Sequence, residues 1–385
     1  MRKRSLLWLI LLPLLFGPSL DVAHAADEIL LPARINNQPV QFTFDTGSDY
    51  SLLFRGAAKR LGLRVTKFEY KLPLAPGKLP LDMAEECTLT FRTNSGKAQF
   101  AVLDDPPYGL ADSDGIIAWS SLSNCVIQVN VEEHVFEFLR DLPSNLKGWS
   151  KWKLVPNSRL LVFECSNGKE AAKVGIDTGS GSGGVGLNPK RWQEWRAKRE
   201  RQQSTIDANW TPADGVVVNE VMRAKKFAIG GLTFNNVLVT VNDPSGDVLF
   251  GHCDAILGLP VLRRLEFIID GRKGILYTRR SNPASGQQDY NRLGAVFVPK
   301  DPDKGDDLVA HVVEGSPAYR AGIRNGDVLL KIGELDATKW RVDPHVLPLS
   351  QFWDQVAGTK LNLTVKRNNQ QSEIMVTLEE LPAVD

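Results

Sequence analysis

An internal duplication is the sequence feature that most limits what this 385-residue chain can fold into. The segment Val40–Ser48 (VQFTFDTGS) recurs 132 positions later as Ala172–Ser180 (AKVGIDTGS). A second landmark, Asp114–Ala118 (DGIIA), recurs 140 positions later as Asp254–Gly258 (DAILG). Two landmarks repeated at nearly the same spacing indicate two lobes that share one fold.

The pattern within each copy predicts β-structure. Asn36-Asn37-Gln38 precedes the first copy and Asn167-Gly168-Lys169 the second, each between apolar runs, as in a β-hairpin. Each later landmark continues through leucine into a strand, Val126–Val131 in the first lobe and Phe267–Asp270 in the second. Frequent turns and few long helices favour all-β lobes.

Composition and turn signals divide the chain into five segments. The stretch from Ser281 to Gln288 is polar and rich in Pro, Gly and Ser, as linkers are, and the sequence beyond it has its own apolar pattern. The predicted boundaries are a signal peptide at 1–25, a first lobe at 26–143, a second lobe at 144–281, a linker at 282–291 and a C-terminal domain at 292–385.

The N-terminus predicts export. Arg2, Lys3 and Arg4 precede the short apolar run Leu6–Phe16, and Ala23-His24-Ala25 fits a cleavage site. The alternative is an uncleaved anchor, although the run is short for a membrane span. No later stretch is long and apolar enough, so we expect a periplasmic or extracellular protein with no membrane span after cleavage.

The charge balance and the spacing of potential metal ligands argue against nucleic-acid-binding and metal-binding proteins. The 46 basic and 45 acidic residues give a net charge of +1, so we expect no nucleic-acid partner. The four cysteines form no CxxC pair and the histidines are scattered, so neither a metal nor another cofactor is expected. In an oxidising compartment we expect disulfides Cys87–Cys125 and Cys165–Cys253, one per lobe, although four cysteines allow three connectivities.

The paired Asp-Thr-Gly-Ser loops, each followed by the later apolar landmark, resemble the retropepsin and pepsin families of aspartic peptidases over residues 29–277. The resemblance implies duplicated acid-protease β-barrel lobes, with Asp45 and Asp177 as the catalytic pair. Two carboxylates about 3 Å apart cannot both ionise comfortably, so they share one proton. The charged carboxylate can then act as base and the neutral one as acid.

The resemblance also implies six residues that support this pair: Thr46, Gly47, Ser48, Thr178, Gly179 and Ser180. The threonine hydroxyls would bond across to the opposite loop, and the glycines would let backbone amides approach the carboxylates. The serine hydroxyls would bond the outer carboxylate oxygens, and turns near Gly77 and Gly215 would be flaps over the substrate. The first lobe departs from the pattern, because Ala118 stands where the family has glycine.

The C-terminal segment Glu314–Leu329 resembles the core of bacterial PDZ domains, with a helix at Leu349–Val356 and strands at Leu361–Lys366 and Glu373–Leu378. PDZ domains bind C-terminal peptide tails as an added strand and hold the carboxylate in a nest of backbone amides. The resemblance places that nest at Leu293, Gly294 and Ala295. The alternative is a domain that packs on the lobes and binds nothing.

These features predict an exported aspartic endopeptidase, mainly β and monomeric, that hydrolyses polypeptide substrates selected with help from the PDZ domain. One alternative is a non-catalytic, chaperone-like envelope protein that binds peptides through its lobes and PDZ domain. Another is a homodimeric peptidase whose Asp-Thr-Gly loops pair across chains.

Overall fold

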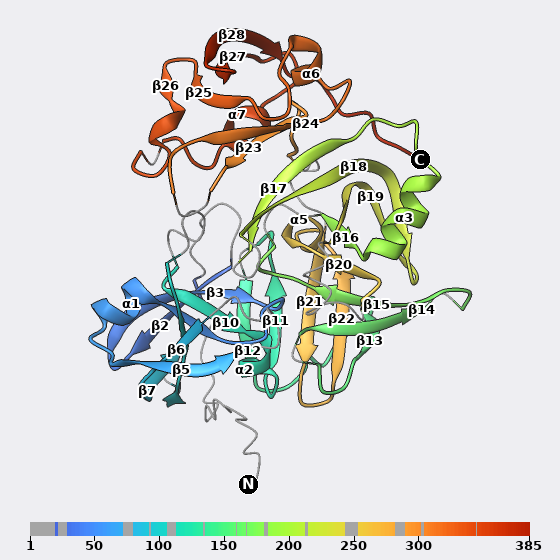
Figure 1. The fold of residues 1–385 in the computed structure, drawn as a ribbon. Helices are drawn as coiled ribbons and strands as arrows, with labels where there is room; N and C mark the ends of the chain where they lie inside the picture. Colours follow the sequence, from blue (N-terminus) through green and yellow to red (C-terminus); the bar gives the residue numbers. More distant parts are fainter. Residues whose placement is uncertain are drawn as a thin grey trace.

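The computed structural model describes residues 20–21, 29–71, 80–91, 94–105, 113–133, 135–158, 160–166, 168–180, 184–211, 215–242, 253–281, 289–301, 304–343 and 345–385. Most of the predicted signal peptide, the first flap turn near Gly77 and the linker residues 282–288 lie outside this part. The prediction of a mainly β protein with two lobes and a C-terminal domain is confirmed (Figure 1). Within the described part, no helix has the length and apolar character needed to cross a membrane.

The first lobe is built on a nine-stranded sheet in the order β5-β6-β9-β4-β10-β3-β2-β7-β8. Its strands are β2 (Leu30–Ile35), β3 (Gln38–Asp45), β4 (Leu52–Phe54), β5 (Val65–Lys71), β6 (Pro80–Ala84), β7 (Cys87–Phe91), β8 (Asn94–Ala98), β9 (Ala101–Leu103) and β10 (Gly115–Ala118), and its helices are α1 (Arg55–Arg60) and α2 (Trp119–Leu122). The predicted β2–β3 hairpin is confirmed. Asn36 and Asn37 have φ of 47° and 69°, the left-handed pair that a two-residue hairpin turn requires.

A thirteen-stranded sheet forms the second lobe and also crosses into the first. Its strands are β1 (Leu20–Asp21), β11 (Val126–Asn130), β12 (Val135–Leu139), β13 (Ser150–Leu154), β14 (Val162–Ser166), β15 (Ala171–Ile176), β16 (Val185–Leu187), β17 (Thr205–Thr211), β18 (Gly215–Ile229), β19 (Leu232–Val241), β20 (Ala255–Leu257), β21 (Leu265–Asp270) and β22 (Ile275–Arg280), with helices α3 (Pro189–Ala197) and α5 (Leu259–Leu262). Among these, β17, β18 and β19 form one long antiparallel ribbon.

The lobes join where β11 pairs antiparallel with β21. Gln128 lies directly opposite Ile268, and these residues are 140 positions apart, the same spacing as the later landmarks. Equivalent residues therefore face each other on a local two-fold axis that relates the lobes. A single cluster of buried apolar side chains runs through both lobes, so they share one core.

The C-terminal domain has its own sheet and its own apolar core. Its strands are β23 (Ala295–Pro299), β24 (Leu308–Val312), β25 (Val328–Ile332), β26 (Leu335–Asp336), β27 (Lys360–Arg367) and β28 (Gln370–Thr377), and its helices are α6 (Pro317–Ala321), η1 (Ala337–Lys339) and α7 (Ser350–Trp353). Helix α7 is shorter than predicted. The Trp353 carbonyl accepts the Arg292 amide at 2.9 Å, so it is used by a segment outside the helix.

The predicted disulfides Cys87–Cys125 and Cys165–Cys253 are wrong, because all four cysteines are free and buried. The Cys87 thiol donates to the Ala98 carbonyl at 3.4 Å across the β7–β8 hairpin. Cys253 packs in a small apolar cluster that does not include Cys165. Two cysteines in one lobe need their Cβ atoms about 4 Å apart to bond, and a shared lobe does not provide that.

We expect the four thiols to be unreactive in the folded protein. Burial raises the pKa of Cys87, Cys125 and Cys165 to about 11 and that of Cys253 to about 12, so very little thiolate is present at neutral pH. A chromogenic thiol reagent should detect almost none in the native protein and four after denaturation without reductant. A lower count in the denatured, unreduced sample would show that a disulfide forms.

Candidate active site

The two Asp-Thr-Gly loops meet at the junction of the lobes, each at the carboxyl end of an inner strand. Asp45 ends β3, which pairs in parallel with β10 so that Asp45 lies beside Ala118. Asp177 follows β15, which pairs in parallel with β20, and its amide donates to the Leu257 carbonyl at 3.0 Å. Equivalent strands of the two lobes thus position the two aspartates.

Two threonines connect the loops by hydrogen bonds that cross between the lobes. Thr46 Oγ1 donates to the Ile176 carbonyl and Thr178 Oγ1 to the Phe44 carbonyl, both at 2.6 Å. Each hydroxyl also accepts the other threonine's amide at 3.1 Å. Both side chains are completely buried. Leaving one such group unpaired would cost about 1–3 kcal/mol, so these bonds fix the spacing of the loops.

The glycines hold each loop against the opposite carboxyl group. A Cβ placed on Gly47 would lie 2.5 Å from Asp177 Cγ, and one on Gly179 would lie 2.4 Å from Asp45 Cγ. Within each loop, the Gly47 amide donates to Asp45 Oδ1 at 2.7 Å and the Gly179 amide to Asp177 Oδ1 at 2.9 Å. The absence of a side chain therefore lets the two carboxyl groups face each other in hydrogen-bonding contact.

The surroundings of the two carboxyl groups raise the pKa values of both. Burial, reinforced by the neighbouring Asp177, raises the pKa of Asp45 well above that of an ordinary carboxyl. Burial also raises the pKa of Asp177, while the Gly179 amide and a hydrogen bond from Asp45 act in the opposite direction. The site therefore favours a pair that holds one proton, and the two carboxyl groups titrate together.

The Ser48 hydroxyl does not act as the resemblance implied. Ser48 Oγ donates its only proton to the Tyr50 carbonyl at 2.9 Å, which closes the turn after the loop. It is the backbone amides of Ser48 and Ser180 that lower the pKa values of Asp45 and Asp177. The contribution of Ser48 to the pair thus comes from its main chain.

Ala118 fits the position where the family pattern has glycine. Its φ of −77° and ψ of 153° are ordinary extended values, as are those of Gly258, −85° and 173°. The Ala118 amide donates to Ser51 Oγ at 3.1 Å, whereas the Gly258 amide donates to the Gly184 carbonyl at 3.0 Å. Ser51 is a supporting residue that sequence reasoning missed, because no motif contains it.

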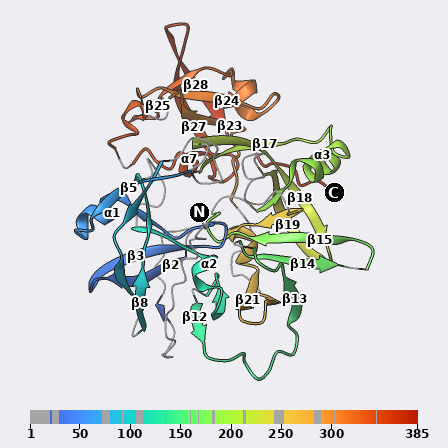
Figure 2. The ribbon, with the colours of Figure 1, turned by 60° about the horizontal axis from the view of Figure 1, so that its bottom comes forward.

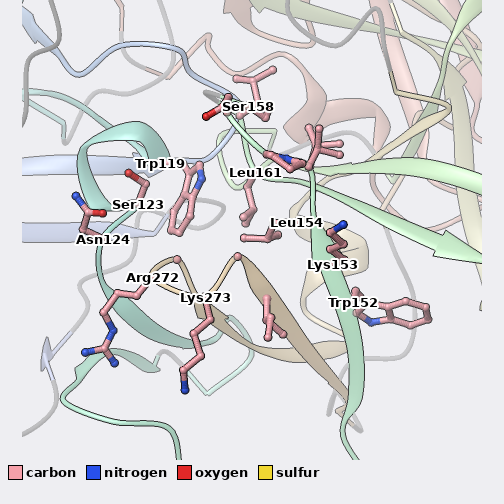
Figure 3. A pocket seen from close by; sticks show the side chains of 18 of the residues that line it. Trp119, Ser123, Asn124, Trp152, Lys153, Leu154, Ser158, Leu161, Arg272 and Lys273 are labelled. Carbon is pink, nitrogen blue, oxygen red and sulfur yellow. The ribbon is translucent and has the colours of Figure 1, made fainter.

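A pocket of about 860 Å³ is lined by residues of both lobes. Its lining comes from α2 and the residues after it, from β13 and the turn that follows, and from the β21–β22 turn. Figure 3 shows Leu154 and Leu161 between Trp119 and the turn that carries Arg272 and Lys273. The Leu161 amide donates to the Thr46 carbonyl at 3.3 Å, so the pocket reaches the back of the first loop. Its described lining residues include no carboxylate, histidine or cysteine that could serve as a second acid–base centre.

The predicted carboxylate nest of the C-terminal domain is occupied by the chain itself. The amides of Leu293 and Gly294 both donate to Asn291 Oδ1, at 2.9 and 3.0 Å. Gly294 has φ of 70°, as such a loop requires, and Ala295 begins β23. A side-chain amide oxygen therefore stands where the carboxylate of a peptide tail was predicted.

Comparison with protein families agrees with these two sites. Residues 31–119 match the family model for aspartyl proteases, and residues 308–367 match a PDZ domain model. No curated protein matches the chain. The chain therefore contains a domain similar to aspartyl proteases, followed by a PDZ domain. The second Asp-Thr-Gly loop lies outside the matched range, and its equivalence to the first rests on the strand pairing and cross-lobe hydrogen bonds.

Proposed function

We propose that the protein is an exported aspartic endopeptidase that hydrolyses peptide bonds with water activated by Asp45 and Asp177. The observation that carries this proposal is the reciprocal contact of each loop glycine with the opposite carboxyl group. A protein that only binds peptides would gain nothing from holding two carboxyl groups in a buried position where their charges repel.

In this proposal Asp177 serves as the base and Asp45 as the acid, because the pair shares one proton. The Asp177 carboxylate takes a proton from a water molecule held between the pair as that water attacks the scissile carbonyl carbon. Neutral Asp45 donates its proton to the carbonyl oxygen in the same step, so no unneutralised oxyanion forms. As the C–N bond breaks, the proton on Asp177 passes to the leaving nitrogen, and one hydroxyl of the gem-diol returns its proton to Asp45, which restores the starting state of the pair.

Two hairpins, one from each lobe, would complete the substrate cleft. Strands β17 and β18 are joined by a turn whose residues 212–214 lie outside the described part, and β5–β6 is the corresponding hairpin of the first lobe. By the family resemblance, both would close over an extended substrate and exclude water from the reaction. The proposal places the protein in the periplasm or outside the cell, because residues 1–25 are predicted to be an export signal.

Cleavage of an unfolded protein tests this proposal. We expect several internal cuts, detectable by mass spectrometry, with a bell-shaped dependence of rate on pH. At low pH both carboxyls are protonated and the base is lost, and at high pH both ionise and the acid is lost. Because the pKa of Asp45 is raised, the alkaline limb of the pH profile should lie above the usual carboxyl range.

A hydroxyl-bearing mimic of the hydrated carbonyl should inhibit the enzyme, and a chelator should not, since the two carboxyls perform both proton transfers. Saturable peptide binding without any cut would instead favour the chaperone-like alternative.

A further inference from the structure

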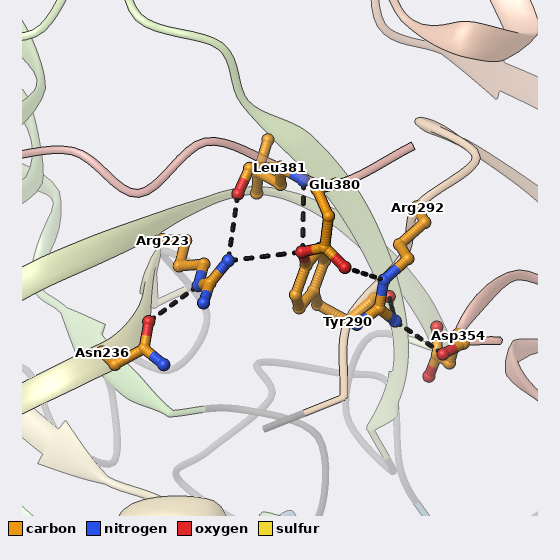
Figure 4. A network of polar contacts seen from close by, with 7 residues as sticks. All are labelled: Arg223, Asn236, Tyr290, Arg292, Asp354, Glu380 and Leu381. Atoms are coloured by element: carbon orange, nitrogen blue, oxygen red, sulfur yellow. Dashed lines mark hydrogen bonds and ion pairs between the residues drawn. The ribbon is translucent and has the colours of Figure 1, made fainter. Parts of the chain in front are cut away.

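The PDZ domain is attached to the second lobe through the segments that enter and leave it. Figure 4 shows both segments around the carboxylate of Glu380, which lies after β28. This carboxylate accepts from the Tyr290 hydroxyl, from Arg223 at 3.4 Å and from Arg292 at 3.3 Å. Arg223 belongs to β18, and Arg292 directly precedes the nest. One side chain thus links the PDZ domain to the lobe's long ribbon.

The C-terminal tail continues this attachment. The Val384 amide donates to the Arg223 carbonyl, and the Val384 carbonyl accepts the Lys225 amide, both at 2.6 Å. The tail therefore pairs with the part of β18 that follows the β17–β18 ladder. The Val384 side chain is buried in the core shared by the two lobes. The PDZ domain is consequently held by chain segments at both ends and is not suspended on a free linker.

Asn291 connects the nest directly to β17. Its Oδ1 accepts the two nest amides, while its Nδ2 donates to the Ile206 carbonyl at 2.9 Å. The Asn291 carbonyl in turn accepts from Thr205 Oγ1 at 2.8 Å. Asn291 and Thr205 are 5% and 3% exposed. A single buried residue therefore fills the nest and holds the first strand of the β17–β18 hairpin.

The edge of the PDZ sheet to which a peptide would add is also covered while Asn291 fills the nest. Strand β23 is an edge strand, and it lies against β17 in the views of Figures 1 and 2. Ala295 and Phe297 face the domain core, so Val296 and Val298 face the other way, yet they are only 1% and 9% exposed. The Phe297 ring also contacts Trp353 of α7, with centroids 6.2 Å apart.

We propose that Asn291 is a switch residue that couples the PDZ nest to the β17–β18 hairpin. A peptide carboxylate needs the Leu293 and Gly294 amides, which Asn291 already uses, so a C-terminal tail and Asn291 cannot occupy the nest together. Entry of a chain terminus displaces the Asn291 side chain and breaks its bond to Ile206. The hairpin is braced when the nest is closed and released when a free C-terminus binds.

The test measures binding and hairpin protection in the full chain carrying Asp177→Asn, which prevents cleavage of the probe. The probe is a fluorescent pool of hexapeptides with free carboxyl termini, compared with the same pool amidated. Asn291→Ala should bind the free-acid pool about tenfold more tightly, since the nest amides no longer have a competing acceptor. Hydrogen exchange of residues 206–208 should become faster in the same variant. Asn325→Ala is the matched control, because Asn325 accepts the Val312 amide at 2.6 Å elsewhere in the domain.

A second variant separates coupling from simple occlusion. Thr205→Val removes only the lobe's bond to the Asn291 carbonyl and leaves the nest untouched. It should tighten free-acid binding by about threefold, as coupling between two sites demands. Free-acid peptide added to the chain in which Asn291 and Thr205 are unchanged should accelerate hydrogen exchange at residues 206–208, and the amidated pool should not. The proposal is overturned if Asn291→Ala binds no better than the Asn325→Ala control, or if Thr205→Val leaves affinity unchanged. Neither readout requires hydrolysis, so failure of the proposed peptidase activity would be seen separately.

Discussion

Replacing either Asp45 or Asp177 with asparagine is expected to lower kcat by about 10³-fold or more, since each carboxyl supplies a proton transfer that the other cannot supply in the same step. The double variant should be no worse than either single one, because the pair acts as a unit. The amide keeps the shape of the carboxyl group, so the fold should remain intact. Turnover of a peptide that the wild type cleaves provides the measurement, with the exposed surface change Asp141→Asn as control.

Asp45→Asn should also change how the stability of the fold depends on pH. Because the folded-state pKa of Asp45 is raised, its neutral form stabilises the fold fully below the unfolded pKa, and this stabilisation is lost as pH rises through the folded pKa. Asp45→Asn has no carboxyl group to ionise at this position, so it avoids that loss. The Tm of Asp45→Asn relative to that of the wild type should therefore rise toward alkaline pH. Near-full activity in Asp45→Asn would mean that the first loop is vestigial, and catalysis would then have to come from second lobes meeting across a dimer.

Gly179→Ala should abolish most activity while leaving most of the protein folded. The added Cβ would lie 2.4 Å from Asp45 Cγ, a distance that forces the carboxyl group away from its partner. Displacing a reacting group by about 1 Å costs about 10²-fold in rate, and we expect a loss of at least that size in kcat. By the local two-fold symmetry, Gly47→Ala should behave in the same way.

A crowded glycine outside the two Asp-Thr-Gly loops provides the matched control. A Cβ on Gly271 would lie 2.0 Å from the Ser123 carbonyl oxygen, in the β21–β22 turn. Gly271→Ala should therefore destabilise the fold by about 1–3 kcal/mol, as overpacking does, while the folded fraction keeps its activity. If both variants lose activity only in proportion to unfolding, the contact at Gly179 has no special catalytic importance.

The duplication predicted much of the fold because both copies carry their constraints locally. Asn36-Asn37 fixes a hairpin, and an apolar strand that ends in Asp-Thr-Gly places its aspartate at a strand end. The repeat spacing predicted two equivalent lobes but not that Gln128 would pair with Ile268, since strand partners depend on contacts far apart in the chain. The prediction of disulfides from two cysteines per lobe failed because bonding depends on distances that sequence position does not fix.

The supporting interactions were harder to predict than the motifs. Ser51 reaches the Ala118 amide from another part of the lobe, so no local pattern marks it. Asn291 lies next to the predicted nest, yet its role depends on Thr205 and Ile206, which arrive from the second lobe. In both cases a polar side chain satisfies a buried backbone group of a distant segment, and its importance becomes visible only once the segments are brought together.

The β11–β21 seam also discriminates between partners. In the observed pairing, Val126 lies opposite Asp270 and Asn130 lies opposite Glu266, so each acidic residue faces an uncharged one. If the second lobes of two chains paired about the same axis, Glu266 would lie opposite Asp270 twice, and like charges placed directly opposite across a ladder repel. The strand sequences therefore favour the union of unlike halves within one chain. Each half is thereby free to diverge from the other while the two loops still meet in one active site.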